Sequence, residues 1–233
     1  LQEKNVLQTA FSAKSSKYVD ALAKLLAFSP VIAKWKFKYN LSLFNYHSMT
    51  KLIVKKIKAG SDDFNTILQI GAWYDTTSFK KKGKIVASYH DGNLAALLNS
   101  PFGYPNISKR YINNVLEYEK KLYSKIDILF PMSKWLADSF YRDFSVPYDK
   151  MEVVGVGANF SEIPPNTNKL HNEPNILFVG VNFTRKGGGL LLRAFEEVRK
   201  EIPSARLKIV SAYVPKTPIK NVDFIGLIDK NTT

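Results

Sequence analysis

The strongest constraint on the fold comes from residues 175–198, where an apolar run, a glycine-rich turn and a helical pattern follow one another directly. Ile176 to Val179 is typical of a strand buried inside a parallel sheet. A turn carrying Arg185 and Lys186 leads into three glycines, 187–189, and apolar residues then recur at helical spacing. This strand–turn–helix unit predicts an α/β fold built on a parallel sheet.

The turn also has the composition of an anion site. Glycines allow the backbone to approach a ligand closely, and a helix N-terminus attracts negative charge. Arg185 and Lys186 add two cations beside Gly187 and Gly188. We therefore predict that these four residues bind a phosphate or diphosphate, although the pattern is neither a Walker loop nor a dinucleotide GxGxxG fingerprint. The alternative is that both cations are solvated and the glycines only form the turn.

The same alternation of strands and helices occurs upstream of this unit. A segment rich in proline and asparagine, 161–174, predicts a linker. We therefore expect two Rossmann-like α/β domains, one at 1–160 and the first part of another at 175–233. Residues 34–39 read as either a short strand or an interfacial segment. The expected strands are 65–70, 84–89, 126–131, 150–155, 175–180, 206–211 and 222–225, and the expected helices are 17–28, 48–58, 111–125, 134–144 and 189–201.

Further candidate site residues follow strands of the first half, where ligands of open α/β sheets bind. His90 has the chemistry to donate to a phosphate or hydroxyl, but a loop histidine also commonly stabilises its own turn. Ser133 opens a helix, which its role as an N-cap explains equally well. Gly157 permits a tight turn near a ligand, or a plain connection. The candidates are His90 and Asp91, Ser133 and Lys134, and Gly157 and Asn159.

Net charge and composition limit which partners the protein can bind and in which cellular compartment it is expected. The net charge is +14, and residues 1–160 hold 23 basic against 13 acidic side chains. Such a surface attracts anionic lipid, nucleotides or nucleic acid, although any one lysine cluster is more often simply solvated. The absence of cysteine fits a cytoplasmic protein, and the three separated histidines predict no metal site. No apolar run approaches the ~20 residues of a membrane span, so any membrane contact is expected to be peripheral.

The order of these motifs resembles the retaining glycosyltransferases of family 4, which have the GT-B fold. Segments 132–159, 178–198 and 203–210 carry the similarity, which extends over about residues 65–228. The resemblance implies that residues 1–160 form the acceptor-side domain and 175–233 the first part of the nucleotide-sugar-binding domain, with the donor held between them. It also implies that a hexosyl group is transferred, with retention, to a glycan or lipid-linked acceptor. It implies no metal or other cofactor.

The resemblance also assigns roles to residues. Lys186 matches the basic residue that holds the donor diphosphate, with Arg185 beside it, and His90 matches the catalytic histidine near the transferred sugar. Asn159, with Gly157, matches an Asn-Gly-Val-Asp turn in which aspartate is usual. Val181 stands where a second cation is usual. The family's acidic E-x7-E motif would follow residue 233, so the chain is expected to be a truncated piece that is inactive alone.

Two other functions remain open from the residues alone. Aromatic residues alternate with lysines over 34–46, as in proteins that bind single-stranded nucleic acid. No RRM, KH or helix-turn-helix signature accompanies them, so nucleic acid is not the expected partner. The other alternative is a non-catalytic scaffold with a GT-B-like fold, which would bind no nucleotide-sugar.

Overall fold

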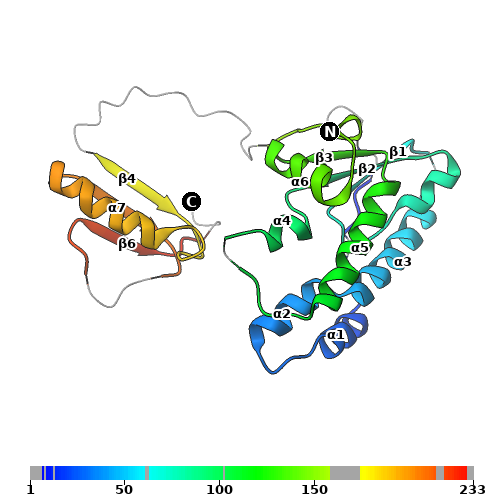
Figure 1. Ribbon diagram of the computed structural model, residues 1–233, viewed down its shortest axis with the longest axis horizontal. Helices are drawn as coiled ribbons and strands as arrows, with labels where there is room; N and C mark the ends of the chain where they lie inside the picture. The colour runs from blue at the N-terminus through cyan, green and yellow to red at the C-terminus, as the bar shows by residue number, and fades with distance from the viewer. Residues whose placement is uncertain are drawn as a thin grey trace. The chain divides into compact units, whose positions relative to one another are not determined.

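The computed structural model describes residues 7, 9–12, 14–60, 63–101, 103–157, 174–213 and 218–229. The chain divides into two compact units, 1–159 and 160–233, each with its own sheet and core (Figure 1). Both sheets consist of three parallel strands, which confirms the predicted α/β class. Asn159 and most of the predicted linker lie outside the described residues.

The sheet of the first unit consists of β1 (Thr66–Ile70), β2 (Ile85–His90) and β3 (Ile128–Pro131), in that order. Side chains alternate between its two faces. Val86 and Leu129 are fully buried on the face that packs against helices, whereas Leu68 and Ile70 are exposed on the opposite face. One face of this sheet therefore builds the core, and the other remains apolar and open.

The helices that pack against the buried face of this sheet include α4 (Leu94–Leu98), α5 (Lys109–Lys125) and α6 (Lys134–Phe144) (Figure 1). Leu122 and Tyr123 of α5 and Phe140 of α6 are at most 1% exposed and join Val86 in one cluster. The 3₁₀ helices η1 (Thr77–Lys82) and η2 (Tyr148–Lys150) and helix α4 were not expected from the sequence.

Residues 17–59 form three successive helices: α1 (Lys17–Leu26), α2 (Ile32–Asn40) and α3 (Leu43–Ala59). The strand considered for 34–39 is therefore wrong. Although lysines and aromatics alternate there, Trp35 and Tyr39 are also four residues apart, which places them on one side of a helix. There the Trp35 Nε1–H donates to the Lys24 carbonyl at 2.8 Å, and the Tyr39 hydroxyl donates to Asp20.

The second unit has a sheet of β4 (Asn175–Val179), β5 (Arg206–Val210) and β6 (Val222–Gly226). Helix α7 (Gly188–Glu201) packs along one face (Figure 1) and places Phe195 against Leu207 and Ile209. The strands and the helix lie within one or two residues of the predicted bounds.

The strand expected at 150–155 is wrong. Only Met151 forms a bridge, to Leu129, and the Glu152 N–H also donates to the Leu129 carbonyl at 2.9 Å. Gly155 has a φ of +69°, a left-handed conformation that an extended strand cannot contain. The segment therefore runs beside β3 for a short distance and then turns.

Candidate functional site

The turn between β4 and α7 is fixed by hydrogen bonds from its own residues. Asn182 organises it: its side-chain Oδ1 accepts from the Arg185 N–H at 3.0 Å, and its carbonyl accepts from the Lys186 N–H at 3.1 Å. The Gly188 N–H donates to the Phe183 carbonyl at 2.8 Å. Sequence reasoning missed Asn182, although asparagine is a common first residue of such turns.

Glycine is required at different positions of this turn for different structural reasons. Gly187 adopts a φ of +82°, and a Cβ on Gly188 would lie 2.2 Å from Cε2 of the Phe183 ring. A Cβ on Gly180 would lie 3.1 Å from Cγ of Lys186, whose aliphatic stem therefore covers that glycine. A Cβ on Gly189 would meet nothing within 4 Å. Backbone conformation and packing thus account for Gly187 and Gly188 without a ligand.

The turn is nevertheless strongly electropositive. Arg185 and Lys186 are both exposed, and neither forms an ion pair with another residue of the described part of the chain. They precede α7, whose N-cap Gly187 contributes no side-chain hydrogen bond. A helix N-terminus carries roughly half a positive charge and unsatisfied N–H groups. Two cations and a helix end therefore converge on one turn, a combination suited to a phosphate-bearing ligand.

The structure does not support the predicted role of His90. The strand extends one residue further than expected, so His90 is the last residue of β2 and is 1% exposed. Strand alternation directs it toward the helices, where its ring centroid lies 5.2 Å from those of both Tyr123 and Phe140. Its Nε2 and the Ser88 Oγ form a hydrogen bond of 2.8 Å. Burial lowers the pKa of His90 to about 4, so the ring is neutral at ordinary pH.

Other predicted residues of the first unit lie at the carboxyl edge of the sheet. Asp91 is exposed directly after β2, and Lys134 is exposed in the first turn of α6. Ser133 is the N-cap of α6, and its Oγ accepts from the Leu136 N–H at 3.2 Å. The Met132 N–H donates to the His90 carbonyl at 2.9 Å and joins the ends of the two strands. Ser133 thus has a capping role that requires no ligand.

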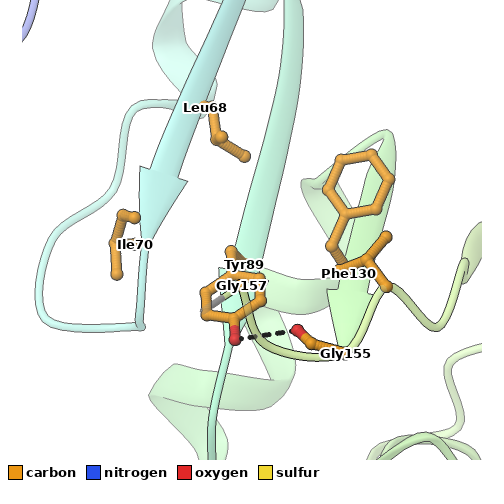
Figure 2. A pocket seen from close by; sticks show the side chains of 7 residues that line it. Leu68, Ile70, Tyr89, Phe130, Gly155 and Gly157 are labelled. Atoms are coloured by element: carbon orange, nitrogen blue, oxygen red, sulfur yellow. Dashed lines mark hydrogen bonds between the residues drawn. The ribbon is translucent and has the colours of Figure 1, made fainter. Parts of the chain in front are cut away.

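Gly157 lies in an apolar groove on the open face of the same sheet (Figure 2). The groove has a volume of about 400 Å³. Its wall is tied together where the Tyr89 hydroxyl donates to the Gly155 carbonyl at 3.2 Å. No charged side chain lines it, so it does not have the chemistry of a diphosphate site. It also lies on the face opposite to His90. The lining residues are Leu68, Ile70, Tyr89, Phe130, Val154, Gly155 and Gly157.

A buried polar cluster beneath the Asp91 loop was not expected. The Glu119 carboxylate of α5 accepts from the Leu94 N–H at 3.0 Å, and Asn93 caps α4 by accepting from the Ala96 N–H at 2.7 Å. The Asn93 amide also donates to Ser139 Oγ at 3.1 Å. Burial raises the pKa of Glu119 to about 7. These contacts hold the loop after β2 in place. The sequence does not predict them, because Glu119 is a single glutamate within a helical pattern.

A comparison with solved structures identifies a similar fold. The crystal structure of TarM, a wall teichoic acid glycosyltransferase, matches with a TM-score of 0.52 and 15% sequence identity. The match covers 78% of this chain and 36% of TarM, so the chain spans about a third of the length of TarM. At this identity the likeness shows the fold alone: an α/β fold with two parallel three-stranded sheets, consistent with a partial GT-B Rossmann-like fold. No protein-family model and no curated protein matches the sequence.

Proposed function

We propose that the protein transfers a sugar from a nucleotide-sugar donor to an acceptor hydroxyl with retention, as in glycosyltransferases of family 4. One observation carries the proposal. The exposed cations Arg185 and Lys186 adjoin the N-terminus of α7, at the carboxyl end of β4, in a chain whose fold resembles that of TarM. Ligands of parallel α/β sheets bind at this edge.

The chemistry of the turn fits the departing group of such a reaction. When the bond between the sugar and the diphosphate breaks, negative charge accumulates on the leaving nucleoside diphosphate. Lys186, Arg185 and the helix N-terminus would stabilise that charge and so lower the barrier. Because these groups supply positive charge directly, the proposal invokes no metal ion. It rests on them and not on His90, which is buried.

The proposed partners follow from the same reaction. They are a nucleotide-sugar donor and a glycan or lipid-linked acceptor, with peripheral contact to an anionic membrane. Nucleic acid is not favoured, because the aromatic residues considered for base stacking are already engaged. Trp35 and Phe37 are only partly exposed, and their rings contact Phe28 and Tyr104 respectively. The structural likeness also gives no reason to prefer a non-catalytic scaffold.

Thermal unfolding with UDP or GDP tests the donor site. A ligand at 100 times its Kd stabilises a protein by about 2.7 kcal/mol, so at least one of the two nucleotides should raise the unfolding midpoint of the wild type. Lys186→Ala should lose most of this protection, since charge-assisted hydrogen bonds contribute about 1.5–3 kcal/mol.

Lys208→Ala is the matched control, because Lys208 is an exposed lysine on β5 of the same unit. That variant should be protected as well as the wild type. The proposed function would be contradicted if neither UDP nor GDP protected the wild type. It would also be contradicted if Lys186→Ala were protected as well as the wild type.

A further inference from the structure

Helix α1 has its apolar residues arranged in the reverse of the usual way. Its buried side is made of small residues, Ala23 and Ala27, which are 0% and 3% exposed. Its large apolar residues face outward, and Leu25 is 70% exposed. A surface helix normally directs its large apolar side chains into the core. The outward stripe therefore has no function in the packing of the described residues.

Large apolar residues are also exposed in the turn after α1 and at the start of α2, where Phe28 is 59% and Ile32 is 65% exposed. Soluble proteins rarely expose many large apolar side chains on one short helical hairpin unless they bind something. We call this set of exposed residues the hairpin surface. Its members are Tyr18, Leu22, Leu25, Leu26, Phe28 and Ile32.

The hairpin that carries this surface is held in place by specific contacts. The Trp35 Nε1–H donates to the Lys24 carbonyl at 2.8 Å, and the Trp35 and Phe28 rings meet edge-on with centroids 5.8 Å apart. Asp20 of α1 accepts from Tyr39 of α2 and pairs with Lys24 at 2.7 Å. The surface is therefore preformed, so a partner would not have to order it on binding.

The charge of the three N-terminal helices, two of which carry the hairpin surface, identifies the partner. Residues 14–60 contain ten lysines and one acidic residue, Asp20, which is already engaged by Lys24 and Tyr39. A second copy of this chain would bring the same lysines against these, which disfavours self-association. A nucleic acid would use the lysines but would leave Leu25 and Ile32 in water. An anionic lipid surface satisfies both kinds of side chain.

We propose that the hairpin surface docks on an anionic lipid bilayer, with its apolar side chains in the interfacial region and the surrounding lysines at the headgroups. None of the described helices is long and apolar enough to cross a membrane, so the contact is superficial. Tyr18 suits this location, because its ring is apolar and its hydroxyl is polar. The inference does not depend on the donor site, since the two surfaces use different residues and ligands.

Co-sedimentation of the 233-residue protein with phosphatidylcholine vesicles, with and without phosphatidylglycerol, tests the inference. The wild type should bind the anionic vesicles, and binding should weaken as salt is added. The double variant Leu25→Ser/Ile32→Ser should bind at least about tenfold more weakly, because two exposed apolar side chains no longer enter the interface. Because both side chains are exposed, the variant should keep the circular dichroism spectrum of the wild type.

The matched control is Leu227→Ser/Ile228→Ser, which changes two adjacent exposed apolar residues of the second unit. It should bind the vesicles as the wild type does. Three results would overturn the inference: no binding to anionic vesicles, equal binding to neutral vesicles, or equal losses in the two double variants. Self-association that the Leu25→Ser/Ile32→Ser variant abolishes, without vesicle binding, would assign the surface to a second copy instead.

Discussion

Replacing Gly188 by alanine should destabilise the second unit by about 3 kcal/mol, at the upper end of the usual cost of overpacking a core. The added Cβ would lie 2.2 Å from Cε2 and 2.3 Å from Cδ2 of the Phe183 ring. That ring cannot easily move aside. It is buried, stacks on Tyr213 with centroids 4.7 Å apart, and meets the edge of Phe178 at 5.6 Å. The clash must therefore shift the turn between β4 and α7, where we propose that the donor binds.

Urea unfolding followed by fluorescence or circular dichroism would measure this loss, and the neighbouring glycines provide the controls. Gly189→Ala should be neutral or stabilising by up to about 1 kcal/mol, because its Cβ meets nothing within 4 Å and alanine favours a helix. Gly187→Ala should cost about 1–2 kcal/mol, because its φ of +82° is left-handed. A Gly188→Ala variant as stable as the wild type would show that Phe183 does not pack over Gly188.

Replacing Glu119 by glutamine should change how the stability of the first unit depends on pH. Burial raises the pKa of Glu119 from its usual 4.5 to about 7, so the folded protein binds a proton that the unfolded chain releases. The stabilisation from this proton is complete below pH 4.5 and is lost as the pH rises through about 7. The shift corresponds to about 3 kcal/mol.

His90 in the same core changes the stability with pH in the opposite direction to Glu119. Burial lowers its pKa from 6.5 to about 4, so its contribution to stability is complete above pH 6.5 and is lost as the pH falls through about 4. Between pH 4.5 and 6.5 the two slopes cancel in the wild type, because folding takes up one proton at Glu119 and releases one at His90. Without Glu119, the slope due to His90 should become visible.

The free energy of unfolding, measured from pH 4 to 8, tests this pair. The free energy of unfolding of Glu119→Gln, minus that of the wild type, should increase by about 3 kcal/mol as the pH is raised from 4 to 8. Glutamine can still accept the hydrogen bond from the Leu94 N–H, so the comparison isolates the charge. Glu117→Gln, on the exposed side of the same helix, should follow the wild-type profile. Parallel curves for Glu119→Gln and the wild type would show that Glu119 is not buried as described.

The sequence predicts regular elements well where one local signal decides them. Helix α6 begins and ends as predicted because Ser133 is an N-cap and its apolar residues keep a helical period. Residues 34–39 were ambiguous because alternating lysines and aromatics fit a strand, while contacts to Lys24 and Asp20, distant in the sequence, select the helix. Tertiary contacts of this kind leave no local pattern.

The candidate site shows a similar division. The cations Arg185 and Lys186 are where the motif predicts them, at the start of a helix after a parallel strand. The orientation of His90 was missed because the strand was expected to end at Tyr89. As the last residue of β2, His90 continues the alternation of Val86 and Ser88 and faces the helices, whereas a loop residue has no fixed face. The reason for Gly188 was also hidden, because it depends on the position of the Phe183 ring and not on a ligand.

The proposed function requires a nucleoside diphosphate to bind at the turn between β4 and α7. Titrating the isotope-labelled protein with UDP or GDP while recording backbone amide NMR shifts tests it most directly. We expect the largest shifts at the amides of residues 185–190 and no shift at Leu207 in the core of the same unit. Lys186→Ala should suppress the response. Shifts confined to other residues, or no shifts at saturating nucleotide, would contradict it.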